Sequence, residues 1–546
     1  MSENIINDNI EENVIGNEKI DKSPYEEITQ KSAKFDICKK DVAFSFIFLF
    51  CSAVFSFMGL WGGFRMGFTV SSVITTIAIT VYVINKTTKI NIFCLLCGIF
   101  SLLLSFAFAI TSNSSVRVWS FGVLIVLSLI WFCSLAKPCE KSDYGILTMI
   151  FKPVFYGSCS NLAKSMVSLF SGKNKKRKAV GSAVLGAVLA FPVLLVVVPL
   201  LISSDAAFSG LALNLIENVA GSVLKLIVAL IITPFIISYC FSLKKDEQKP
   251  CENIEIKSVD TPIIISFLSV MSVCYLTYLF SQLAYFFSAF SGFLPDDYSF
   301  TVSEYARRGF FEMCIIAAIN FVIILVCLLL SRKNEGKISV ATKVLCTFVG
   351  FFTLVIIATA LSKMFLYIKS FGMTELRITT TAFMIFLSVT FISLMIKVFI
   401  SKIRVLRVAL ISAAAVLTLL GIFNINNIIA GYNYNAYING KLDKIDVYAI
   451  YELGEEGIPY LAKLTESDDY TVSNEAEQWL KEVVYKSGKY YENFYDEEGY
   501  YSIGKKLYTD LGQFSFSRNK AYKVLDEYLS ENPEVLYFEP LNEYGY

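Results

Sequence analysis

Long apolar runs joined by short polar connections occupy residues 42 to 430 of this chain. A helix rises about 1.5 Å per residue, so about 20 apolar residues cross a hydrocarbon core roughly 30 Å thick. The run Ala179 to Ile202 holds no charged residue over 24 positions. Helices of soluble proteins present a polar face to water, so a soluble protein cannot bury this many apolar runs. The sequence therefore predicts an all-α polytopic transmembrane bundle.

Composition agrees with a membrane protein. Hydrophobic residues make up 55% of the chain and charged residues 17%, whereas soluble domains average about 25% charged residues. We expect eleven spans: 42–60, 66–84, 90–110, 116–136, 179–202, 220–242, 263–285, 309–330, 344–367, 380–400 and 407–430.

The runs and the charge pattern divide the chain into five expected parts. They are a polar cytoplasmic tail (1–41), a four-helix transmembrane segment (42–136), a basic linker (137–178), a seven-helix transmembrane core (179–430) and an extramembrane helical domain (431–546). No cleavable signal-peptide pattern precedes the first apolar run.

Lysine and arginine indicate the orientation. Loops rich in these residues stay in the cytoplasm. If the N-terminus is inside, the inner segments carry 29 basic residues and the outer loops carry six: Arg65, Arg117, Arg307, Arg308, Lys369 and Arg377. With eleven spans, the last domain then lies outside. One missed or false span would reverse the side of that domain.

The basic linker contains a stretch of mixed apolar and basic residues. Ile146 to Phe170 mixes apolar residues with Lys152 and Lys164. We expect helices that lie on the inner membrane surface, with the lysines toward anionic lipid head groups. The alternative is an ordinary cytoplasmic loop.

Several chemistries are excluded by residues that the chain lacks. It contains no histidine, which removes His-based acid–base catalysis and His-ligated metal or haem sites. Cys94 and Cys97 form a CxxC inside an apolar run, where ordinary core residues are the simpler reading. No phosphate-binding loop or dinucleotide motif is present. We therefore expect no cofactor, no metal, no nucleic-acid partner and no catalytic residue.

Ionisable residues gather near the predicted outer boundary. Glu304 and Arg308 share a helix face, and Glu312 continues that face into the membrane. Lys225 and Lys363 fall at a similar depth on two other predicted spans. A lone charge in lipid is costly, so we expect these groups and Arg307 to pair with one another. A helix-locking ion pair is the first interpretation, and a substrate or ion site is the second.

The same region resembles a known family. SEYARRGFFE (Ser303–Glu312) and SFGMTELRITTTAFM (Ser370–Met384) are similar to an uncharacterised bacterial family of polytopic membrane proteins, described only as a domain of unknown function. Three further similar pieces are Pro199–Phe208, Asn435–Asp443 and Phe514–Ala521. The likeness covers roughly residues 180 to 530. It implies a bacterial cell-membrane protein with a C-terminal extramembrane segment and without an assigned reaction.

The segment after Gly431 is acidic and rich in tyrosine. It carries 22 acidic and 11 basic residues, and 19 of the 30 tyrosines. From Lys441 the pattern predicts short helices, with Tyr490–Tyr501 as an exposed loop and Asn519–Ser530 as a further helix. A solvated acidic face is the simple explanation. The alternative is a surface that binds Ca²⁺, an envelope polymer or a partner protein.

Three classes of function remain open. The first is a non-catalytic membrane protein with an outer domain, acting in sensing, assembly or envelope upkeep. The second is a transporter or channel that uses the charged cluster, although no inverted repeat is evident. The third is an envelope enzyme with a lipid-linked substrate, but the first outer loop, Trp61–Arg65, has no carboxylate. The sequence favours the first class and a cell-membrane location with the N-terminus in the cytoplasm.

Overall fold

The computed structural model describes most of the predicted spans and most of the C-terminal segment. The described residues are 39–61, 63–84, 90–137, 143–170, 220–244, 259–290, 310–331, 338–487, 491–495, 501–505 and 514–532, with isolated positions between 186 and 204. The fifth predicted span, 179–202, therefore lies almost wholly outside the described residues.

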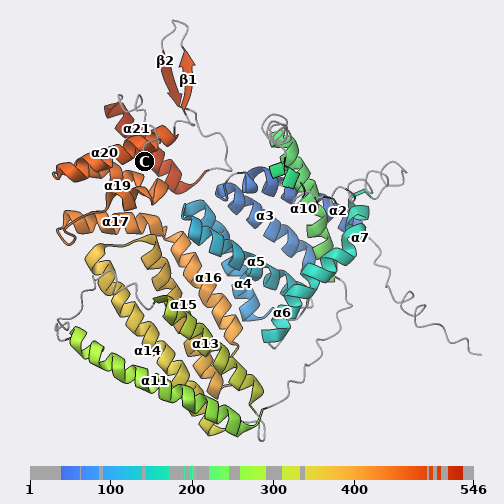
Figure 1. Ribbon diagram of the computed structural model, residues 1–546. Helices are drawn as coiled ribbons and strands as arrows, with labels where there is room; N and C mark the ends of the chain where they lie inside the picture. Colours follow the sequence, from blue (N-terminus) through green and yellow to red (C-terminus); the bar gives the residue numbers. More distant parts are fainter. Residues whose placement is uncertain are drawn as a thin grey trace, which may run out of the picture.

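The chain folds as a polytopic helical bundle (Figure 1). Among the described residues, 10 helices are long and apolar enough to cross a membrane. They are α2 (Lys39–Val54) with the π-helical segment η1 (Phe55–Leu60), α3 (Met66–Val83), α4 (Ile92–Ile110), α5 (Ser114–Ala136), α10 (Ala220–Lys244), α11 (Thr261–Phe290), α13 (Phe310–Leu330), α14 (Val340–Phe371), α15 (Glu375–Phe399) and α16 (Val405–Ile422).

The helices form two groups, each with its own core. The first contains α2 to α5 and α10, and its buried residues include Phe68 and Phe108, whose ring centroids are 4.5 Å apart. Cys94 and Cys97 are fully buried in this core. The second contains α11 and α13 to α15, around residues such as Phe391. Helix α16 contacts α4, α5 and α15, so it joins the two groups.

Small residues allow α16 to lie close to α4. A Cβ atom added at Gly421 would lie 2.5 Å from the Cβ of Ala107. Small residues at helix contacts are typical of membrane proteins, where backbones must approach closely to gain packing energy. This contact helps to hold the two groups together.

A crosswise segment covers one end of the first group. It consists of α6 (Asp143–Phe151), a π-helical segment η2 (Lys152–Gly157) and α7 (Ser158–Phe170), and α7 packs against α10 and α2 (Figure 1). The hydroxyls of Ser168 and Ser45 are 2.8 Å apart. The linker is helical, as expected, while its position on the inner membrane surface and its contact with anionic lipids stay predictions.

An ion pair marks the same end of the bundle. Asp41, which is 3% exposed, lies at the start of α2. Its Oδ1 accepts a hydrogen bond from Tyr82 at 2.9 Å and lies 3.2 Å from Nζ of Lys244. The beginning of α2 and the ends of α3 and α10 thus meet here. We call this the basic end of the bundle, after the lysine-rich segments that adjoin it in the sequence.

The eleventh predicted span, 407–430, is wrong at its C-terminal end. Helix α16 ends at Ile422, and Asn424 adopts a left-handed conformation with φ of 48°. A new helix, α17 (Ile425–Ile438), then runs across the end of the bundle (Figure 1). The break has a polar cause, because Asn424 donates hydrogen bonds to the carbonyl of Ile110 at 3.4 Å and to Ser517 at 2.7 Å.

A small helical domain sits on α17. It contains α18 (Val447–Tyr451), the 3-10 helix η3 (Gly454–Glu456), α19 (Ile458–Leu464), α20 (Tyr470–Ser487) and α21 (Phe516–Glu531). The stretch predicted as a loop, Tyr490–Tyr501, instead contributes to an antiparallel hairpin of β1 (Tyr491–Tyr495) and β2 (Tyr501–Lys505). Its many aromatic residues favour extended structure. The loop prediction is therefore wrong.

Candidate functional site

The predicted cluster of six charged residues stays a prediction, because only half of its members lie among the described residues. Three of them lie outside that part of the chain: Glu304, Arg307 and Arg308. Nζ of Lys225 is 5.9 Å from the ring centroids of both Phe57 and Trp61, within the first helix group. Glu312 is exposed in the first turn of α13, and no described ion pair joins it to Lys225 or Lys363. Pairing of Glu312 with Arg307 or Arg308 stays a prediction.

A different set of charges joins the C-terminal domain to the bundle. Nη1 of Arg65, in the loop before α3, is 2.7 Å from Oε1 of Glu455 in η3. Ser515, the N-cap of α21, accepts from Arg65 at 3.1 Å and donates to Glu455 at 3.2 Å. Nε of Arg518 is 3.7 Å from the same carboxylate. The side chains of Arg65 and Glu455 are only 17% and 19% exposed, so loss of one partner would leave a largely buried charge.

The next glutamate binds a second loop of the bundle. Glu456 is 3% exposed. Its carboxylate accepts hydrogen bonds from the backbone N–H of Ser112, at 3.0 Å, and from the Ser112 hydroxyl. Nearby, Arg117 donates to the carbonyl of Thr111 at 2.9 Å. Two successive glutamates of one 3-10 turn therefore hold the α2–α3 and α4–α5 loops.

Asparagines of α17 hold a third loop and reinforce the second. Asn433 donates to the carbonyl of Met373 at 2.7 Å and accepts from its N–H at 2.7 Å. Asn426 accepts from Asn113 at 2.8 Å and donates to the carbonyl of Leu453 at 3.3 Å. The α14–α15 loop is thereby fixed to α17. We call this end, where three loops contact the domain, the domain end of the bundle.

The apolar core is also continuous across this contact. The core of the C-terminal domain includes Val116 of α5, which is 1% exposed. Met373, Ile378 and Leu420, all from the bundle side, pack against it. Polar and apolar contacts together make the domain and the bundle one packed body at this interface, which we call the seam.

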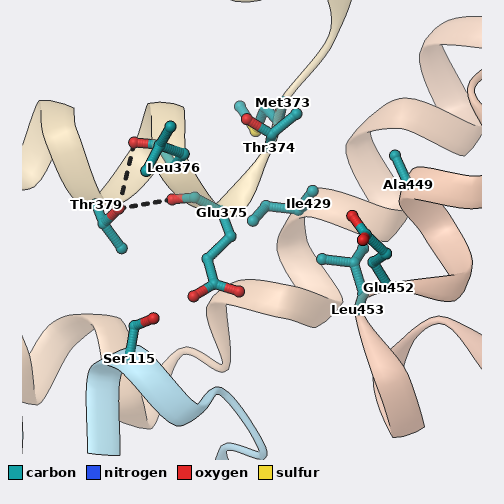
Figure 2. Close-up of a pocket in the computed structure, with 10 residues that line it drawn as sticks. All are labelled: Ser115, Met373, Thr374, Glu375, Leu376, Thr379, Ile429, Ala449, Glu452 and Leu453. Carbon is teal, nitrogen blue, oxygen red and sulfur yellow. Dashed lines mark hydrogen bonds between the residues drawn. The ribbon is translucent and has the colours of Figure 1, made fainter. Parts of the chain in front are cut away.

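The seam contains a cavity of about 320 Å³ that is partly open to solvent (Figure 2). Its walls come from the beginnings of α5 and α15 and from α17, α18 and the turn after α18. The lining residues are Ser115, Met373, Thr374, Glu375, Leu376, Thr379, Ile429, Ala449, Glu452 and Leu453. This mixture of apolar side chains and a few polar groups is typical of pockets that bind small molecules.

Two carboxylates line the cavity from different segments. Glu375 lies in the first turn of α15, and Figure 2 shows its side chain extending toward Ser115. Glu452 directly follows α18, on another wall. Neither carboxylate has an ion-pair partner in the described part of the chain. In contrast, Glu455 and Glu456, a few residues further along, are both bound.

The nearest arginine of α15 has other partners. Arg377 donates hydrogen bonds to the carbonyls of Phe371, at 2.9 Å, and Gly372, at 2.5 Å. Its guanidinium carbon lies 4.0 Å from the ring centroid of Tyr367. Because its donors are directed to the end of α14, Arg377 does not neutralise Glu375.

A separate polar group lies within the second helix group. Asn320 of α13 is fully buried. It accepts from the hydroxyl of Tyr275 at 2.5 Å and donates to Thr353 at 2.9 Å. This chain links α11, α13 and α14. Such bonds stabilise helix contacts in a membrane, and buried polar groups at such depth are also found along transport pathways.

Among the described residues, no group of three or more His, Cys, Asp or Glu side chains could hold a metal ion. The chain has no histidine, so acid–base chemistry at the seam would fall to carboxyl, phenol or ammonium groups.

Sequence reasoning named Arg65 and Arg117 only as outer basic residues and missed their partners. One feature of the sequence could have indicated a partner for these arginines. The pair Glu455-Glu456 stands between two glycines in a segment expected on the same side of the membrane as those arginines. Nothing in the local sequence indicated Asn433 or the cavity residue Glu375.

Comparison with known proteins gives one match. Residues 73–464, most of the chain, match the family described as a domain of unknown function, DUF4153. The match begins earlier than the residue 180 expected from the resemblance and ends before residue 530, at the last residue of α19. No curated protein and no solved structure matches the chain. On the extent of the family match, the chain belongs to the DUF4153 family of proteins.

Proposed function

We propose that this protein is a non-catalytic component of the bacterial cell envelope whose C-terminal domain acts as a rigidly seated module for sensing or assembly. The observation that carries the proposal is the buried contact of Glu455 with Arg65 and Arg518. A domain that is only tethered needs no such contact. A domain that passes a mechanical or binding signal to the helices does need one.

The seam gives a physical route for that signal. Displacement of η3 would pull on the loops that precede α3 and α5, through Glu455 and Glu456. Displacement of α17 would pull on the α14–α15 loop, through Asn433. The domain therefore contacts both helix groups, and a partner that moves it would move them together.

The positive-inside rule supports the proposed orientation. The N-terminus and the basic end would face the cytoplasm, and the C-terminal domain would face outward. Its net acidic, tyrosine-rich surface would then meet an envelope protein or polymer. Single-cysteine labelling at position 500 with a membrane-impermeant reagent, in a background without native cysteines, tests on which side of the membrane the C-terminal domain lies. Labelling only after permeabilisation would contradict the outward orientation.

A transporter is the second candidate, and the buried Asn320 with its partners is the observation that favours it. A deletion strain, challenged with salt and detergent to find an envelope phenotype, separates the two. Complementation by Glu455→Arg should fail under our proposal, while Asn320→Leu should complement when its protein level matches wild type. The reverse pattern would favour transport. Membrane abundance of each variant is the control.

A further inference from the structure

We propose that the cavity at the seam binds a small organic cation, an alkyl chain that carries primary ammonium groups. The proposal goes beyond the module function above, because a ligand could occupy the cavity whatever the domain contacts. It starts from the cavity itself, about 320 Å³ between two packed parts of one chain. Cavities of this size accept ligands with a modest number of heavy atoms.

The two carboxylates in the lining favour a positively charged ligand. Glu375 and Glu452 approach the cavity from the bundle and from the domain, and neither has a described counter-charge. The position of Glu375 has a simple explanation, since a carboxylate in the first turn of a helix is stabilised by the helix dipole. That explanation does not extend to Glu452. It follows the end of α18, and its side chain is exposed, so its carboxylate is open to a ligand that enters from solvent.

The rest of the lining selects an organic ligand over a metal ion. Among the described residues no donor set suits a metal. Apolar side chains also line the cavity, and they include Leu376, Ile429 and Leu453. A methylene chain would bury apolar surface against them, while a terminal ammonium would reach a carboxylate or a hydroxyl such as that of Ser115. An ammonium offers three donors and no acceptor, which matches a lining of oxygen acceptors.

Bound in this way, the ligand would bridge the two sides of the seam. One ammonium would contact the bundle through Glu375 and the other would contact the domain through Glu452. Such a cation would also reduce the repulsion between two carboxylates that share one cavity. A diamine or polyamine has the required charges at both ends, whereas a simple monoamine has one.

Isothermal titration calorimetry on the full-length protein in nanodiscs tests the proposal. The probes are cadaverine and spermidine, with pentane-1,5-diol as an uncharged control of the same length and Mg²⁺ as a control for general charge screening. We expect saturable binding of the amines that weakens as salt rises, and no binding of the diol. Equal binding of diol and cadaverine, or no binding of either amine, would overturn the proposal.

Variants locate the site. Glu375→Gln and Glu452→Gln should each weaken cadaverine binding about fivefold, the effect of about 1 kcal/mol from a partly exposed ion pair. Glu466→Gln, which removes an exposed carboxylate elsewhere in the domain, is the matched control and should leave affinity unchanged. Ala449→Phe fills the cavity without changing charge and should also abolish binding. Unchanged affinity in Ala449→Phe would show that the amine binds elsewhere and would refute the assignment.

A lysine side chain of a peptide has the same chemistry as a free amine. Titration with a short lysine-containing peptide, compared with its acetyl-lysine form, separates these sources. Peptide binding that is weakened in both Glu→Gln variants would assign the cavity to a protein partner, and binding of free amines alone would assign it to a metabolite. The complementation assay does not depend on this result, so failure here would leave the module function standing.

Discussion

Replacement of Glu455 by glutamine should loosen the C-terminal domain from the bundle. The glutamine side chain has nearly the same size and can still accept a hydrogen bond from Ser515, so the change removes charge and little else. Arg65 would lose a partner at 2.7 Å and Arg518 a partner at 3.7 Å. The Arg65 guanidinium would remain largely buried without the carboxylate that it contacts in the wild-type protein.

The size of the effect follows from burial. Loss of one partner of a fully buried ion pair costs about 3–5 kcal/mol. Side chains that are 17% and 19% exposed keep some contact with water, so we expect about 2–3 kcal/mol here. About 1.4 kcal/mol corresponds to a tenfold change in an equilibrium constant. Backbone amides that are protected by the contact between domain and bundle should therefore exchange roughly 30- to 150-fold faster.

Hydrogen exchange measured by mass spectrometry on α19 and α21 checks this value. Glu452→Gln is the matched control, because it lies three positions away without a described ion pair, and it should change exchange less than about twofold. A double-mutant cycle with Arg65→Met should give a coupling energy of about 1–2 kcal/mol. If Glu455→Gln behaves like Glu452→Gln, the ionic contact does not seat the domain and our reasoning about the seam fails.

Three other substitutions test separate contacts. Gly421→Val places a branched side chain where even a Cβ atom would lie 2.5 Å from that of Ala107; it should cost about 1–3 kcal/mol in thermal unfolding in detergent, with partial rescue by Ala107→Gly. Asn433→Leu leaves the N–H and C=O of Met373 unsatisfied and should cost about 2 kcal/mol, seen as faster exchange of the Met373 amide; unchanged exchange would contradict the contact. Asp41→Asn breaks the ion pair at the basic end and should lower the free energy of unfolding by about 2 kcal/mol, whereas an unchanged melting temperature would argue against that pair.

The membrane-spanning part of this fold was predictable because its signal is local. Ten of the eleven predicted spans match helices in the described residues. The length of each apolar run is enough to locate the spanning helix in the sequence. Errors arose where polar contacts decide the structure. The helix after Val405 ends at Ile422 because Asn424 finds partners on a loop and on α21. The local sequence around Asn424 contains no pattern that indicates those partners.

The seam was beyond sequence reasoning for a related reason. Arg65 and Glu455 are 390 positions apart, and each is an ordinary charged residue in its own surroundings. Their meeting depends on the packing of whole helices. The charged motif near residue 308 is more distinctive because several ionisable residues stand close together in sequence. Its pairing stays a prediction, since Glu304, Arg307 and Arg308 lie outside the described residues.

The long separation across the seam also constrains how the protein can be made. Arg65 enters the membrane region early in synthesis, whereas Ser515, one of its partners, is 450 positions later. During that interval the loops before α3 and α5 lack their contacts with the C-terminal domain. A chain that stops before α21 would keep all its apolar spans but would leave Arg65 incompletely satisfied. Completion of the last helix is thus the event that converts an inserted set of helices into a finished molecule.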